Sequence, residues 1–189
     1  MNRATALLAA FLLAFGLLLP HAHAASEDDA KFDANEIMDA GHKFFGETTA
    51  GVAEVVEYTF AKLGKPNGYI IGEEGAGAFI GGLRYGEGTL ILKNGTRQKV
   101  FWQGPSIGFD FGGNGSRVLV LVYNISGPDQ IFDRFPGVDG SAYVVGGLGV
   151  NFQKNGERTL APIRTGVGAR LGVNAGYLKY TAKPTWNPF

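Results

Sequence analysis

The strongest indication of the fold is the segment Arg117-Val118-Leu119-Val120-Leu121-Val122-Tyr123. Valine and leucine alternate from Val118 to Val122 without a polar residue, so a strand formed here is apolar on both faces. One face should pack inside a sheet, and the other should pack under an amphipathic helix. The stretch therefore predicts a mainly β protein whose sheet is covered by helical structure.

A pattern typical of strands continues on both sides of this segment, from Pro66 onward. Short runs of β-branched and aromatic residues alternate with Gly, Pro and Asn-Gly pairs, and the short connections favour antiparallel pairing. Three of these pairs fit hairpin turns: Asn94-Gly95, Asn114-Gly115 and Asn155-Gly156. We expect about ten strands, near Tyr69–Glu73, Gly77–Tyr85, Thr89–Leu92, Gln98–Trp102, Ser106–Phe111, Arg117–Tyr123, Ala142–Phe152, Thr159–Ile163, Gly166–Val173 and Gly176–Thr181.

Glycine is frequent within these strands, and the chain has 30 in all. Interior glycine weakens a strand, so its repeated use indicates strong coiling, bulges or the close approach of another backbone. A small antiparallel β-barrel would supply that reason, and a sandwich is the alternative. The terminal Phe189 also suits a membrane barrel, but most expected strands are shorter than the roughly 9–11 residues that such barrels use. A soluble barrel is favoured.

A helical segment precedes the strands. Apolar residues recur at spacings of three, four and seven between Asn35 and Leu63, as on an amphipathic helix, and Gly64 and Pro66 end the pattern. Gly46 and Gly51 weaken its middle, so two short helices or one kinked helix are expected. One or two further helical turns are expected within Asp129–Phe135. The expected organisation is a helical segment at 34–65 and a β-barrel domain at 66–189.

The first residues are typical of a secretory signal peptide. A basic start at Arg3 is followed by an apolar run from Ala4 to Leu19 and by small residues that end at Ala24. The apolar run falls short of the roughly 18–20 residues that span a membrane. We expect cleavage after Ala24, export to a bacterial periplasm, and a flexible acidic leader over residues 25–33.

Composition excludes several classes of site. The chain has no cysteine, and its 17 basic and 17 acidic residues are not gathered into runs that would favour nucleic acid. His42 is the single histidine after the expected cleavage point, so neither a zinc site nor a Ser-His-Asp triad is predicted. No cofactor is expected. A hydrolase that works with two carboxylates, such as Asp110 and Asp139, is the remaining enzymatic alternative.

A group of large polar and aromatic residues is the candidate binding site. If several of them point to one end of the barrel, they could bind a sugar or an anionic lipid head group through stacking and charge-assisted hydrogen bonds. The alternative is that they cap a closed barrel and pair with nearby acids. The candidate ligand contacts are Arg84, Tyr85, Trp102, Tyr143 and Arg164, with Gln103 and Arg170 in the wider group.

Several long sequence segments, or strings, are similar to those of a known protein family. They are Phe44-Phe45-Gly46-Glu47, Gly64-Lys65-Pro66-Asn67, Arg84-Tyr85-Gly86-Glu87-Gly88-Thr89-Leu90, Trp102 to Gly112, Arg134 to Ser141, Leu160 to Gly168 and Trp186-Asn187-Pro188-Phe189. On these strings the sequence resembles the envelope integrity protein A (EipA) family of alphaproteobacteria. The stretch from Gly75 to Gly82 and the stretch from Gly108 to Gly112 also resemble, locally, the SYLF lipid-binding domain.

The family resemblance implies a small soluble periplasmic β-barrel that helps the envelope resist stress, without enzymatic activity. We therefore expect a non-enzymatic protein that maintains cell-envelope integrity by contact with lipid, glycan or another periplasmic protein, and that does not span the membrane. A periplasmic lipid- or glycan-binding module is the alternative function.

Overall fold

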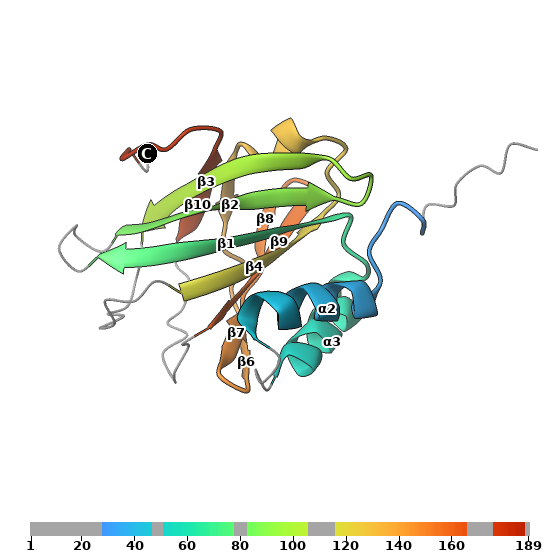
Figure 1. Cartoon of the computed structure of the whole chain (residues 1–189). Helices are drawn as coiled ribbons and strands as arrows, with labels where there is room; N and C mark the ends of the chain where they lie inside the picture. The colour runs from blue at the N-terminus through green and yellow to red at the C-terminus, as the bar shows by residue number, and fades with distance from the viewer. Residues whose placement is uncertain (1–27, 47–50, 78–82, 106–115, 166–175, 188–189) are drawn as a thin grey trace, which may run out of the picture.

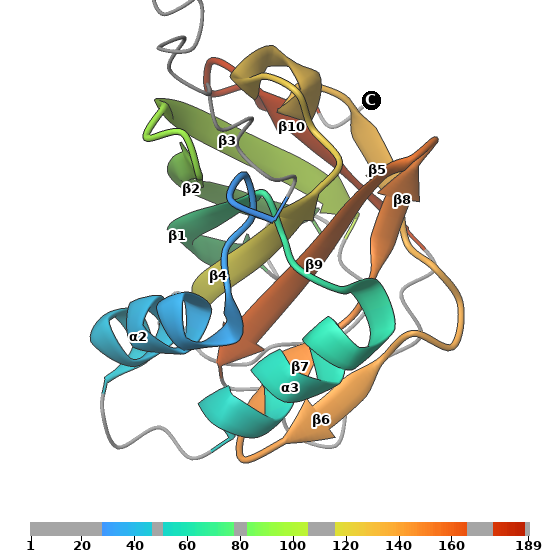
Figure 2. The same ribbon diagram turned by 90° about the vertical axis from the view of Figure 1, so that its right-hand side faces the viewer.

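A computed structural model of the 189-residue chain describes residues 28–46, 51–77, 83–105, 116–165 and 176–187. The described residues form a strongly curled antiparallel sheet with two helices against part of its outer side (Figures 1 and 2). The mainly β fold predicted from the sequence is confirmed. The expected signal peptide, and the strands expected at Ser106–Phe111 and Gly166–Val173, lie outside the described residues.

The sheet contains ten strands within the described residues, in the order β5-β10-β3-β2-β1-β4-β9-β7-β6, and β8 pairs with β9. A β-bridge between Gly137 and Gln153 joins the segment after β5 to β8, so the curled sheet returns on itself. The strands are β1 (Gly68–Gly77), β2 (Leu83–Leu92), β3 (Arg97–Pro105), β4 (Ser116–Tyr123), β5 (Arg134–Pro136), β6 (Tyr143–Val145), β7 (Leu148–Val150), β8 (Gln153–Asn155), β9 (Arg158–Thr165) and β10 (Tyr177–Thr181).

Two of the predicted hairpin turns are confirmed. Asn94-Gly95 connects β2 to β3 and Asn155-Gly156 connects β8 to β9. Gly95 has φ +87° and Gly156 has φ +59°, the left-handed conformation that glycine adopts without a steric penalty. The third pair, Asn114-Gly115, lies outside the described residues.

Strand β4 separates two apolar cores, as its sequence predicts. Val118, Val120 and Val122 point into the barrel, which is filled by large side chains that include Trp102 and Tyr180. Leu119 and Leu121 point the other way, into a second core beneath the helices. Because side chains alternate across a strand, an uninterrupted apolar run can serve both cores at once.

The helical segment forms two helices, α2 (Ala34–Phe45) and α3 (Val52–Leu63). A capping box of Asp33 and Glu36 starts α2, and Gly46 and Gly51, both with positive φ, separate the two helices. No helix among the described residues is long and apolar enough to cross a membrane. The helices bury Ile37, Phe45, Val52, Val55 and Val56 against β4, β7 and β9.

Two strand predictions were wrong in their bounds. Thr89–Leu92 is the end of the long strand β2, and Ala142–Phe152 is broken into β6 and β7 because Gly146 and Gly147 turn the chain with positive φ. The helical turn expected within Asp129–Phe135 is present as a short 3₁₀ helix, η2 (Pro128–Ile131), after which the chain pairs as β5. The strand β8 has too few residues to show a pattern in the sequence.

Candidate functional site

A row of paired residues crosses the inside of the barrel. Glu74 on β1 is paired with Gly86 on β2, Gly86 with Trp102 on β3, and Trp102 with Tyr180 on β10. Directly paired residues lie on the same face of a sheet. Glu74, Trp102 and Tyr180 therefore meet inside the barrel, where each is at most 6% exposed.

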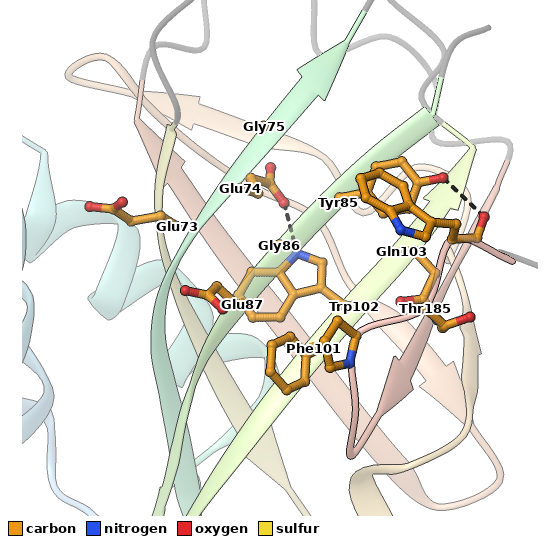
Figure 3. Close-up of a pocket in the computed structure, with 12 residues that line it drawn as sticks. Glu73, Glu74, Gly75, Tyr85, Gly86, Glu87, Phe101, Trp102, Gln103 and Thr185 are labelled. Atoms are coloured by element: carbon orange, nitrogen blue, oxygen red, sulfur yellow. Dashed lines mark hydrogen bonds between the residues drawn. The ribbon is translucent and has the colours of Figure 1, made fainter. Parts of the chain in front are cut away.

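Glu74 is the centre of a buried ion network. Its Oε1 accepts a hydrogen bond from Arg164 Nε at 2.6 Å and lies 3.5 Å from Arg84 Nη1. Its Oε2 accepts one from Trp102 Nε1 at 3.2 Å (Figure 3). Burial alone would raise the pKa of Glu74, but the two guanidinium groups and these hydrogen bonds outweigh it and hold the pKa below its ordinary value. Glu74 is therefore an ionised structural acceptor.

Further hydrogen-bond donors lie next to this network, toward β9 and β10. Arg164 Nη1 donates to Asn151 Oδ1 at 2.9 Å, but Asn151 Nδ2 and the Tyr180 hydroxyl find no hydrogen-bond partner among the described residues. Burial raises the pKa of Tyr180, so its hydroxyl stays protonated. The interior is therefore polar at this point, with more donors than acceptors.

The glycines of β1 and β2 make room for the Trp102 indole. A Cβ on Gly86 would lie 2.2 Å from that ring, and a Cβ on Gly72 would lie 2.8 Å from it. The ring therefore lies against bare backbone, which explains why the strands carry interior glycine at these positions.

Acid should destabilise the protein through Glu74. Its folded-state pKa is lowered, so its contribution to stability is complete above the unfolded pKa of about 4.3 and is lost as the pH falls toward the folded value. We expect the urea midpoint to drop as the pH falls below about 4.3. A Glu74→Gln variant, which cannot titrate there, should show a flatter profile, and an equally steep one would contradict the assignment.

A groove lies on the opposite face of the same strands. Two outward rows flank it, Gly75-Tyr85-Gln103 and Glu73-Glu87-Phe101, each paired across β1, β2 and β3. The C-terminal segment Pro184–Trp186 also lines it, and its volume is about 430 Å³ (Figure 3). We call this feature the outer groove.

The side chains of the outer groove are aromatic or polar. Tyr85 donates its hydroxyl to the Trp186 carbonyl at 3.2 Å, and the two rings meet edge to face at 5.2 Å. Lys99 forms an ion pair with Glu87 at 3.4 Å and lies over the Phe101 ring. Gln103 is 1% exposed, and its Nε2 finds no partner among the described residues.

The structure divides the five predicted contact residues among three places. Arg84, Trp102 and Arg164 meet around Glu74 inside the barrel. Tyr85 follows Arg84 directly and lies in the outer groove, because neighbours in a strand face opposite ways. Tyr143 lies on β6, stacked on Tyr58 of α3 at 4.1 Å. Arg170 lies outside the described residues.

Glu74 in the interior was missed by the sequence analysis, as was most of the outer groove, including Trp186, Phe101 and Glu87. Glu74 and Glu73 are adjacent carboxylates on opposite faces, as strand alternation requires, and Glu73 is exposed. Two arginines and one acid at inward positions could have indicated the ion network. Trp186 follows the last strand, where no periodic pattern identifies its neighbours. Among the described residues, no three His, Asp or Glu side chains gather as metal ligands.

Comparison with known proteins adds the following. The family model described as envelope integrity protein A matches residues 30–189. A crystal structure of a β-barrel-like, uncharacterised protein from Brucella abortus is similar to this chain at 59% sequence identity and a TM-score of 0.78, covering 85% of this chain and 99% of that one. No curated protein matches the chain significantly.

Proposed function

Because the chain belongs to the envelope integrity protein A family, we propose that it is a non-enzymatic periplasmic protein that maintains the integrity and stress resistance of the cell envelope. The observation that carries this proposal is the family match over residues 30–189. It begins at residue 30, within the leader expected at 25–33, and includes both the helices and the sheet.

The geometry supports a contact role over a catalytic one. The interior of the described barrel is packed, with Trp102, Phe135 and Tyr180 almost fully buried. Arg84, Arg164 and Trp102 all contact the Glu74 carboxylate, which is therefore engaged as a structural acceptor and poorly suited to exchanging protons with a substrate. The outer surface then supplies the contacts with lipid, glycan or protein in the envelope.

The periplasmic placement rests on the amino terminus. Residues 1–24 have the three-part pattern of a signal peptide, and cleavage after Ala24 would release a chain that starts with the acidic leader. The domain organisation proposed from the sequence places the helical segment at 34–65 and the barrel at 66–189.

Deletion of the gene tests the proposal. The deletion strain should become more sensitive to detergents and to cell-wall antibiotics, because the envelope loses a supporting component. Sensitivity is measured by colony counts on graded concentrations. The full-length gene should restore growth, whereas a gene without residues 4–19 should not, because its product stays in the cytoplasm. Unchanged sensitivity of the deletion strain would contradict the proposed function.

A further inference from the structure

The outer groove presents aromatic surface that the helices do not cover. Trp186 is 77% exposed, and Tyr85 and Phe101 are partly exposed beside it. The helices contact β4, β6 and β7, and none of their residues lines the groove (Figure 1). Grouped aromatic rings in a concave surface commonly mark a binding site, since each ring offers a flat apolar face.

The charge of the groove argues against an anionic ligand. Glu73 and Glu87 line it, and no lysine or arginine is among its described lining residues. The neighbouring Lys99 is already paired with Glu87. A phosphate head group would meet carboxylates there, and a fatty acyl chain would strip water from them without replacing their hydrogen bonds.

An uncharged sugar suits both the aromatic rings and the carboxylates of the groove. One face of a sugar ring is made of C–H groups and can pack on an aromatic ring, while its hydroxyls can donate to carboxylates and accept from an amide. The volume of about 430 Å³ lies within the usual range of roughly 300–1,000 Å³ for small-ligand sites.

Gln103 supplies an independent sign of a ligand. Buried side-chain amides normally have hydrogen-bond partners, but Gln103 Nε2 has none among the described residues although the side chain is 1% exposed. Thr185 lies next to Gln103 in the wall of the groove (Figure 3). A shift of the Thr185 side chain would open this donor to a ligand in the groove, with Trp186 still in the wall.

We propose that the outer groove binds a short, uncharged oligosaccharide of hexose or N-acetylhexosamine units. Tyr85, Phe101 and Trp186 stack on the sugar rings, Glu73 and Glu87 accept from hydroxyls, and Gln103 donates. The inference rests on the proposed function, since it names the envelope component that the protein contacts.

Tryptophan fluorescence tests the inference at a known position. The chain has two tryptophans, Trp102 buried at 1% exposure and Trp186 at 77%. The protein is purified after expression of the full-length gene and titrated with tetra-N-acetylchitotetraose and, separately, with cellotetraose. At least one of the two oligosaccharides should cause a saturable blue shift of the tryptophan emission. The Trp186→Phe variant should lose the shift, because Trp102 is then the sole emitter.

Isothermal titration calorimetry measures the affinity without relying on tryptophan fluorescence. Trp186→Ala should weaken binding of the oligosaccharide that causes the shift about tenfold, as expected for an exposed aromatic anchor. Val144→Ala, an exposed apolar position on β6, should leave affinity unchanged and serves as the matched control. Equal melting temperatures of the two variants would show that Trp186 acts on binding and not on folding.

Contrary outcomes separate the two proposals. Absence of saturable binding by either oligosaccharide overturns the glycan site, as does Trp186-dependent binding to phosphatidylglycerol vesicles without sugar binding. A deletion strain fully rescued by the Trp186→Ala gene would remove the groove from the envelope role while leaving that role intact. Sugar binding by a protein whose deletion has no envelope phenotype would instead overturn the proposed function.

Discussion

Replacing Glu74 with alanine is expected to lower the free energy of unfolding by about 3–5 kcal/mol, because the change removes the carboxylate that Arg84 and Arg164 share. Both guanidinium groups would keep the cost of leaving water but lose their main counter-charge. A loss of this size is a large part of the roughly 5–15 kcal/mol that a typical domain has. Urea unfolding followed by circular dichroism measures it.

The adjacent acid is a matched control. Glu73 is exposed on the other face of β1, so Glu73→Ala should change stability by no more than about 0.5 kcal/mol. If Glu74→Ala fails to yield folded protein, Glu74→Gln offers a milder test. Its side chain has nearly the same shape, and its one amide oxygen can keep one of the two hydrogen bonds that Glu74 accepts from Arg164 and Trp102. Equal stabilities of the Glu73 and Glu74 variants would show that the ion network does not hold the barrel together.

The fold was largely predictable because its strongest signals are local. The apolar run of β4 contains enough information to place one face in the barrel and the other beneath the helices. Gly46 and Gly51 correctly divided the helical segment, and the Asn-Gly turns at β2–β3 and β8–β9 follow from backbone conformation alone. Short strands such as β5 and β8 were missed because three residues cannot display a period.

The candidate site was predictable only in part, because it depends on strand pairing. Arg84, Trp102 and Arg164 come together through the pairings of β3 with β2, β2 with β1, β1 with β4 and β4 with β9, over up to 90 residues of sequence. Strand alternation alone separates Tyr85 from Arg84, and that step could have been taken from the sequence. Tyr143 lies apart from the other predicted contact residues because it stacks on Tyr58 of α3, and no local sequence pattern reveals this contact.

Gly86→Ala is expected to destabilise the protein by about 3 kcal/mol, near the upper end of the usual cost of overfilling a core. The new Cβ would lie 2.2–2.4 Å from three atoms of the Trp102 indole, and that ring is 1% exposed and hydrogen-bonded to Glu74. It therefore cannot move aside without breaking the ion network. Thermal and urea unfolding measure the loss.

Gly75→Ala supplies the control, since Gly75 also lies in an interior strand but a Cβ there meets nothing within 4 Å. It should be neutral or slightly stabilising, because alanine loses less backbone entropy on folding. Trp102→Ala alone should cost about 3–5 kcal/mol through the cavity it leaves. The double variant Gly86→Ala/Trp102→Ala should lose less than the sum of the two single losses, because the methyl group then enters empty space. Strict additivity would contradict the conclusion that glycine is needed at position 86 to seat the indole.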